Sequence, residues 1–207
     1  MAHLKPWLAI CLALMAPWAH AASFDDPEWP CVQRKVLHLS TGQMWAGPLI
    51  EEADLTAWRK AEDVATLAPV LAVRRTAQEE ADRLITTFAD ASGDGRAEKL
   101  RLLFAGTFAL IDRERTEIIQ GIARYAKTQT ALSQTIEDAQ NEITALAGKA
   151  DKTFDDEDRI EELEDKLHWD MRIYKDRQQS LTFVCETPTI LEKRAFSMAR
   201  SIMNALE

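Results

Sequence analysis

The spacing of apolar residues between residues 118 and 146 is the strongest constraint that this sequence places on its fold. Nine positions alternate at intervals of four and three residues: Ile118, Ile122, Tyr125, Gln129, Leu132, Ile136, Ala139, Ile143 and Leu146. This rhythm is typical of a coiled coil, because it keeps one narrow apolar seam facing a partner helix. Since no proline interrupts residues 96–147, we expect one long helix there, or two helices joined by a kink.

A second segment, residues 156–183, carries the same rhythm. It continues through Ile160, Leu163, Leu167, Tyr174 and Leu181. Asp170 and Arg177 intrude on this seam, and Met171 is expected to compensate in part. Between the two segments, residues 148–154 read as a turn, and the carboxylates of Asp155–Asp158 favour the positive N-terminal end of the second helix.

The two segments predict an antiparallel hairpin if they pair within one chain. Facing residues then have numbers that add up to about 303, which sets Gln129 against Tyr174 and brings Cys185 beside Ile118. The seam is equally compatible with pairing between two chains. Its polar members form a candidate interaction surface that could also fix the register: Tyr125, Gln129, Tyr174 and Arg177.

The N-terminus has the layout of a secretory signal peptide over residues 1–21. Lys5 supplies a positive start, Trp7–Ala16 is an apolar run, and Ala19–Ala21 has the small residues of a cleavage site. A lipoprotein reading of Cys11 is disfavoured, because this cysteine lies inside the apolar run. We therefore expect an exported protein, periplasmic in a Gram-negative bacterium and otherwise secreted. Because no later stretch is long enough to span a bilayer, no stable membrane insertion is expected after cleavage.

Signal cleavage would leave Cys31 and Cys185 as a pair in an oxidising compartment. This parity predicts a disulfide, which on a chain-entropy argument would stabilise the fold by about 5 kcal/mol. The wide spacing differs from the C-x-x-C arrangement of redox catalysts. An intermolecular bridge and free thiols remain as alternatives.

The remaining elements are predicted from turn and capping signals. Residues 22–52 contain Pro27, Pro30 and Pro48 and read as an irregular arm, which Trp29 and Trp45 would anchor to the helices. Within this arm, Ser40–Gln43 has the spacing of a capping box. Helices are expected at about 54–67 and 69–90, with Pro69 in the first turn of the second, and Ala91–Gly95 as a break in which Asp94 caps the next helix. A last helix would start at Thr187 and Pro188, with core contacts from Ile190, Phe196, Met198, Ile202 and Met203.

These predictions combine into an all-α fold. We expect an elongated helical bundle over residues 53–207, with a long antiparallel coiled-coil hairpin at about 96–184 and a short irregular N-terminal arm. The first half of the long helix is more apolar all round than the second, through residues such as Leu100, Phe104 and Leu110, so it should contact more than one neighbour.

Charge and motifs limit the function classes. The chain has 25 Lys+Arg against 34 Asp+Glu and a formal net charge of −9, which argues against nucleic acid as a partner. We find no recognisable catalytic signature, so no enzyme activity and no cofactor are predicted. Asp90–Arg101 begins like a calcium loop but lacks the glutamate at its last position. A weak metal candidate is the cluster Glu161, Glu164, Asp165 and His168, whose spacing on one helix suits a bundle metal site that needs a matching second helix.

Two functional hypotheses follow from the sequence. The first is an exported, non-enzymatic interaction or scaffold protein, whose partner is another extracytoplasmic protein or a second copy of the chain. The alternative is an extracytoplasmic accessory protein that binds a ligand or metal, such as a sensor or a chaperone. A hydrolase with an atypical site is a third reading.

Overall fold

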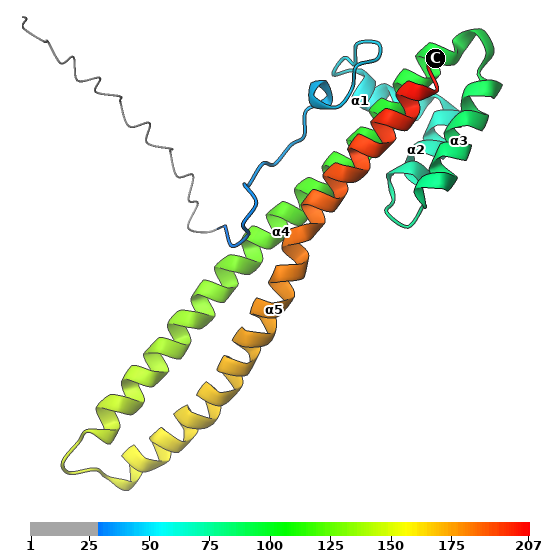
Figure 1. Ribbon diagram of the computed structural model, residues 1–207. Helices are drawn as coiled ribbons and strands as arrows, with labels where there is room; N and C mark the ends of the chain where they lie inside the picture. Colours follow the sequence, from blue (N-terminus) through cyan, green and yellow to red (C-terminus); the bar gives the residue numbers. More distant parts are fainter. Residues whose placement is uncertain (1–28) are drawn as a thin grey trace, which may run out of the picture.

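The computed structural model describes residues 29–207, and this range folds into helices and loops without a strand (Figure 1). The elements in chain order are η1 (Thr41–Gln43), α1 (Asp54–Ala57), η2 (Trp58–Lys60), α2 (Glu62–Ala72), α3 (Gln78–Ala91), η3 (Gly93–Gly95), α4 (Arg96–Ala147) and α5 (Phe154–Asn204). The predicted all-α class and helical bundle are confirmed. The predicted signal peptide, residues 1–21, lies outside the described residues, as do residues 22–28.

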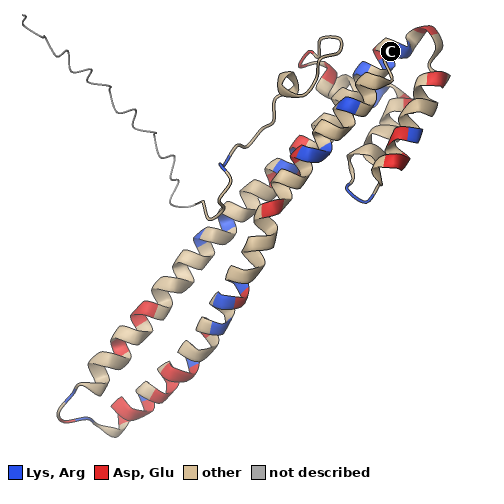
Figure 2. Cartoon of the chain, in the orientation of Figure 1, with Lys and Arg blue, Asp and Glu red and all other residues tan. Residues whose placement is uncertain are grey.

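Helices α4 and α5 dominate the shape of the molecule. α4 has 52 residues and α5 has 51, and they lie side by side with a short connection at residues 148–153 (Figure 1). At 1.5 Å per residue, each helix is about 75 Å long. α4 begins and ends at the residues expected from the proline-free stretch. Carboxylates gather on the part of α5 nearest to the connection (Figure 2). Within residues 29–207, no helix has the combination of length and hydropathy that a bilayer crossing requires.

The main core, which we call the head, lies at the other end of the helix pair. There α1, α2 and α3 pack against the first part of α4 and the last part of α5 (Figure 1). The apolar first part of α4 supplies five buried residues to this core: Leu100, Leu103, Phe104, Phe108 and Ile111. This explains why that stretch is more apolar all round, whereas the rest of α4 carries a single seam.

A close approach between Gly106 and Trp58 fixes η2 against α4. A Cβ atom at Gly106 would stand 2.8 Å from the ring of Trp58, which is 4% exposed. Only glycine leaves room for the indole at this point, because an ordinary carbon–carbon contact needs more than 3.4 Å. The sequence shows this glycine as an isolated one, and the structure gives the reason for it.

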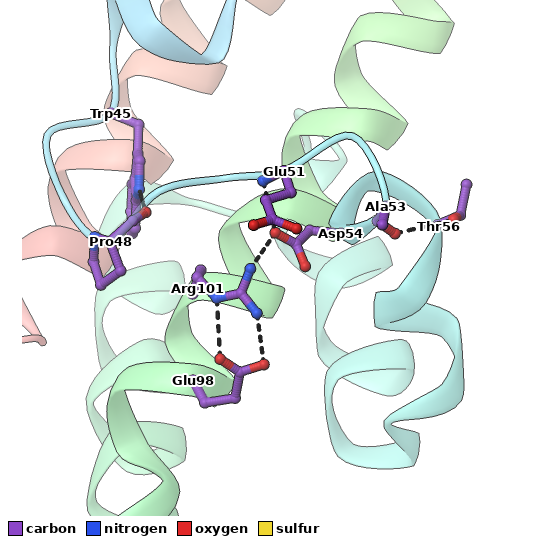
Figure 3. A network of polar contacts seen from close by, with 8 residues as sticks. All are labelled: Trp45, Pro48, Glu51, Ala53, Asp54, Thr56, Glu98 and Arg101. Carbon is purple, nitrogen blue, oxygen red and sulfur yellow. Dashed lines mark hydrogen bonds and ion pairs between the residues drawn. The ribbon is translucent and has the colours of Figure 1, made fainter.

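Trp45 anchors the N-terminal arm to the head, as predicted. Its ring stacks on Phe104 with the centroids 4.3 Å apart. Its Nε1 donates to the carbonyl of Pro48 at 2.7 Å (Figure 3). The buried ring therefore satisfies its single polar group within the arm. Trp29 is only half-buried and donates to Gln33 in the same arm, so the anchoring role predicted for it is not seen in these contacts.

A polar network holds α1 to α4 beside this anchor. Arg101 forms an ion pair with the buried Asp54 and two hydrogen bonds with Glu98, at 3.0 and 2.6 Å (Figure 3). Hydrogen bonding to Glu98, together with the charge of Asp54, raises the pKa of Arg101 above its ordinary value. Asp54 also accepts from the backbone N–H of Glu51 at 2.8 Å. The residue that breaks the calcium-loop pattern thus has a structural role.

Pro188 does not start a separate helix, which corrects the prediction. α5 runs unbroken from Phe154 to Asn204, with Pro188 buried inside it. A proline removes one hydrogen bond from a helix and crowds the carbonyl four residues before it. Here the buried positions keep their spacing through the proline, so packing against α4 and the head outweighs this cost: Pro188, Leu191, Ala195, Met198 and Ile202. As a consequence, Ile190 and Phe196 are exposed, although core contacts were predicted for them.

Four local predictions are also wrong. Pro69 lies inside α2 rather than at the start of the next helix, and the chain turns at residues 73–77 instead. Gly95 precedes α4 with no side-chain cap, so Asp94 does not cap it. Ser40 precedes η1, but its side chain makes no capping bond. Met171 does not compensate for the seam, because it is 50% exposed.

Candidate binding surfaces along the long helix pair

The disulfide between Cys31 and Cys185 ties the arm to the middle of α5. The bridge joins residues 154 apart in sequence, with their Cα atoms 5.5 Å apart. This confirms the disulfide predicted for Cys31 and Cys185, the two cysteines outside the expected signal peptide. Cys185 is buried, so the bridge also covers part of α5.

A set of side chains on α4 holds the arm just after the disulfide. Asp112 accepts from the N–H of Leu39 at 2.7 Å and lies 2.9 Å from Nδ1 of His38. Thr116 donates to the carbonyl of Leu37 at 2.8 Å. We call these contacts, together with those of Arg115, the arm clasp. They satisfy backbone groups of a segment that has no regular structure of its own.

Arg115 is the most buried member of the arm clasp. It is 4% exposed, donates to the carbonyls of Val36 and Leu37, and lies 3.8 Å from Glu192 on α5. Arg115 was not among the functional residues predicted from the sequence. A signal existed, because Arg115 precedes Ile118 by three residues and so occupies a seam position, where a charge needs a specific partner.

The predicted polar patch lies between α4 and α5. Gln129 is 8% exposed, and its amide donates to the carbonyl of Tyr174 at 3.1 Å. Tyr125, Tyr174 and Arg177 are half-buried. The bond between Gln129 and Tyr174 is the contact that the sequence predicts for this pair, and it uses part of the patch within the chain.

Two grooves flank the helix pair near the disulfide. The first has a volume of about 300 Å³ and is almost wholly apolar, lined by Ile118, Gly121, Ile122, Tyr125, Ser180, Leu181 and Val184. The second, of about 440 Å³, lies beside Pro30 and Cys185 and has polar walls that include Gln129, Ser133 and Gln178. The apolar groove is therefore the better match for an apolar group.

The connection and the start of α5 are strongly acidic. Thr153 and Asp156 form a capping box, in which each side chain accepts from the backbone N–H of the other. Lys149 donates to Asp156 at 2.6 Å, and this bond, with those from Thr153, lowers the pKa of Asp156 to about 2. Of the carboxylates that were expected to cap this helix, Asp156 is the one that makes the capping bond.

The weak metal candidates are not brought together. Glu161, Glu164, Asp165 and His168 are all exposed on α5. Within residues 29–207, no group of three or more His, Cys, Asp or Glu side chains converges in a way that could hold a metal ion.

Comparison with protein-family models, with curated proteins and with solved structures finds no match for this chain. The function of this chain is therefore inferred from its own residues. Their geometry consists of a head, a clasped arm and a long helix pair with an acidic end.

Proposed function

We propose that this chain is an exported, non-enzymatic interaction protein in which α4 and α5 form an antiparallel coiled-coil hairpin. The far part of this hairpin, residues 125–175, is the contact surface for an extracytoplasmic protein. The observation that carries the proposal is that this part lies beyond the head and yet keeps a continuous seam of buried and half-buried side chains.

Contacts at several levels support the hairpin. Lys149 contacts Asp156, Arg159 contacts Glu142 at 2.9 Å, and Gln129 contacts Tyr174, so successive partners move apart symmetrically from the connection. All nine predicted seam positions of α4 are buried or half-buried. A seam of this kind stabilises two helices without any other neighbour.

The separation of the hairpin from the head supports a contact role. The main hydrophobic core includes Ile111 on α4 and Leu191 on α5, with Ile118 packed against it, and contains no residue from 119–190. Between residues 119 and 190, apart from the N-terminal arm that reaches Cys185 through the disulfide, each helix has only the other to pack against in the described chain. A 50-residue extension that stabilises nothing else in the fold is best explained by a use outside it.

The charge of the hairpin indicates the chemistry of its partner. Exposed carboxylates cluster on α5 near the connection, including Asp158, Glu161, Glu164 and Asp165 (Figure 2). Such a surface attracts a basic protein surface and speeds its association at low salt. We therefore propose a partner with a basic contact face.

Shortening the hairpin by one matched heptad tests the proposal. Deletion of residues 140–146 together with residues 157–163 removes facing segments and keeps both seams in phase. It shortens the hairpin by about 10 Å and leaves the head and the arm clasp unchanged. We expect the partner recovered by cross-linking from the exported chain to be lost while the melting temperature of the head is retained. Unchanged recovery would exclude this hairpin as the contact surface.

A variant of full length separates shape from charge. Replacing Asp158 and Asp165 by Asn, and Glu161 and Glu164 by Gln, keeps the helix while removing four charges. We expect weaker recovery at low salt and a smaller difference at high salt, because exposed charges are screened beyond about 8–10 Å. Recovery that is equal to wild type at every salt concentration would show that the acidic face has no role.

The apolar groove favours a second candidate function, a ligand-binding accessory protein. Gly121 lines this groove, and a Cβ there would meet only Arg124, at 3.9 Å. A Gly121→Leu variant should therefore fill the groove without disturbing the head. If the groove binds apolar ligands, the enhanced fluorescence of anilinonaphthalene sulfonate should be lost in Gly121→Leu and kept in Thr135→Leu, an exposed position nearer to the connection. Equal fluorescence in all three proteins would remove this candidate.

A further inference from the structure

The outer side of α5 carries two large apolar residues that stand partly in solvent, Trp169 and Ile173, and the guanidinium of Arg172 lies 5.9 Å from the centre of the Trp169 ring. Trp169 is 60% exposed and Ile173, one turn later, is 39% exposed. On the same side of the helix, Lys166 lies three residues before Trp169 and Asp176 lies three residues after Ile173. We call Lys166, Trp169, Ile173 and Asp176 the outer stripe.

The outer stripe is separate from the seam that faces α4. The seam residues around it are Leu167, Asp170 and Tyr174, which are all half-buried, whereas the side chain of Lys166 is 54% exposed and Asp176 is exposed. The stripe therefore has the spacing of a second coiled-coil seam, with the same alternation of three and four residues, on a side of α5 that faces solvent.

The order of residues in the stripe is self-complementary. It reads basic, apolar, apolar, acidic, and the four positions are arranged symmetrically about residue 171. When such a stripe meets a copy of itself in the opposite direction, each basic end faces an acidic end and the apolar residues meet in the middle. A two-fold interface requires this property, because the same patch is used on both sides.

We propose that the chain forms a homodimer in which α5 packs antiparallel against α5 of a second copy through the outer stripe. Trp169 lies opposite Ile173 of the second copy, and Lys166 lies opposite Asp176 of the second copy, each contact occurring twice. Lys166 already donates to Asp170 at 2.7 Å, and its ammonium group has further donors for the second carboxylate.

Charge also selects this register over its main competitor. Phe183 is 74% exposed and lies further along the same side of α5, so a longer overlap would set Trp169 opposite Phe183 of the second copy. That arrangement is centred on residue 176 and places Asp176 against itself. The repulsion between two facing carboxylates disfavours it, whereas the proposed register pairs each of them with a lysine.

The proposal goes beyond the interaction role above, because its occupant is this chain itself. The two can fail independently, since the matched heptad deletion leaves residues 166–176 in place. A heptad-deleted chain that remains a dimer but no longer recovers the partner would show that the two contacts are distinct. A monomeric chain that still recovers the partner would show the same.

Sedimentation equilibrium of the exported chain, with its disulfide intact, tests the dimer. We expect the mass of a dimer at micromolar concentration and of a monomer for Trp169→Glu. Met171→Glu is the matched control, because Met171 is 50% exposed but lies off the stripe, and this variant should remain a dimer. The proposal would be overturned if the wild-type chain is still a monomer at a 100-fold higher concentration than that used for the variants. Equal dissociation of the Trp169→Glu and Met171→Glu variants would also overturn it.

A charge exchange tests the register. Lys166→Asp and Asp176→Lys should each raise the dissociation constant by about tenfold or more, because each variant places like charges opposite one another. The double variant exchanges the two signs and should restore the wild-type constant within about threefold, provided that circular dichroism shows equal helix content. A double variant that is weaker than both single variants would overturn the antiparallel pairing.

Discussion

At the residue scale, two glycines in α4 differ in the space that a side chain would have. Gly106 gives room to the ring of Trp58, while Gly121 faces the open apolar groove. Sequence alone shows both as isolated glycines in a long helix and assigns the same cost to each. Only the tertiary contact distinguishes them.

We therefore predict that the two Gly→Ala variants shift stability in opposite directions. Gly121→Ala should stabilise the protein by about 1 kcal/mol, because alanine has the higher helix propensity. Gly106→Ala should destabilise it, because overpacking a buried ring costs about 1–3 kcal/mol and exceeds the gain in propensity. Urea unfolding followed by circular dichroism measures both changes. Shifts of the same sign would contradict the contact with Trp58.

Asp156 should make stability depend on pH in a narrow acidic range. Its pKa is lowered from 3.8 to about 2 by the bonds from Lys149 and Thr153, so the folded state favours the carboxylate. The resulting stabilisation is present above pH 4 and is lost as the pH falls towards 2. Melting temperatures of wild type and Asp156→Asn, measured from pH 5 to pH 2, should converge as the pH falls. A constant difference over that range would argue against the lowered pKa.

At the scale of elements, the sequence predicts what short-range chemistry decides. The bounds of α4 followed from the absence of proline, and the start of α5 was expected near the acidic run that supplies Asp156. The prediction that Pro188 starts a helix is wrong, because the buried positions Leu191 and Ala195 continue the apolar spacing of α5 through the proline. The spacing of those residues in the sequence carried the correct signal.

The arm clasp could not be predicted in the same way. Asp112 and Arg115 bind backbone groups of an irregular segment, and no sequence pattern in residues 36–39 identifies those groups as partners. The disulfide was predicted without geometry, from the two cysteines that remain after the expected signal cleavage.

The clasp predicts a local effect on amide exchange. In an Asp112→Ala variant the N–H of Leu39 loses its acceptor, so its exchange with deuterium should accelerate at least about tenfold while the core amides of α4 are unchanged. Asp138→Ala, an exposed position on the same helix, is the matched control and should leave Leu39 unaffected. Equal exchange of Leu39 in wild type and Asp112→Ala would refute this contact in solution.

The disulfide should contribute to global stability. Its loop spans 154 residues. By restricting the unfolded chain, such a loop would raise the free energy of unfolding by at most about 5 kcal/mol. A Cys31→Ser, Cys185→Ser double variant should unfold at a lower urea concentration than the oxidised wild type and should match the wild type under reducing conditions. An oxidised wild type that contains two free thiols by mass analysis would contradict the bridge.

At the scale of the whole molecule, composition and periodicity predicted an all-α bundle, because helix pairing follows directly from apolar spacing. The sequence indicated only in part that the head and the far part of α4 and α5 differ in their packing. The one indication was the broader apolar surface of α4 before residue 118. The packing of α1 to α3 was less predictable, since these short helices are positioned by contacts such as that between Trp58 and Gly106.

The central claim is that the far part of the hairpin contacts another protein. Site-specific photo-cross-linking in the exporting cell tests it most directly, with the probe at Asn141, exposed on α4, and the control probe at Val70, exposed on the head. We predict an adduct to a protein other than this chain from Asn141 and none from Val70. Adducts from Val70 alone would contradict the claim and assign the contact to the head.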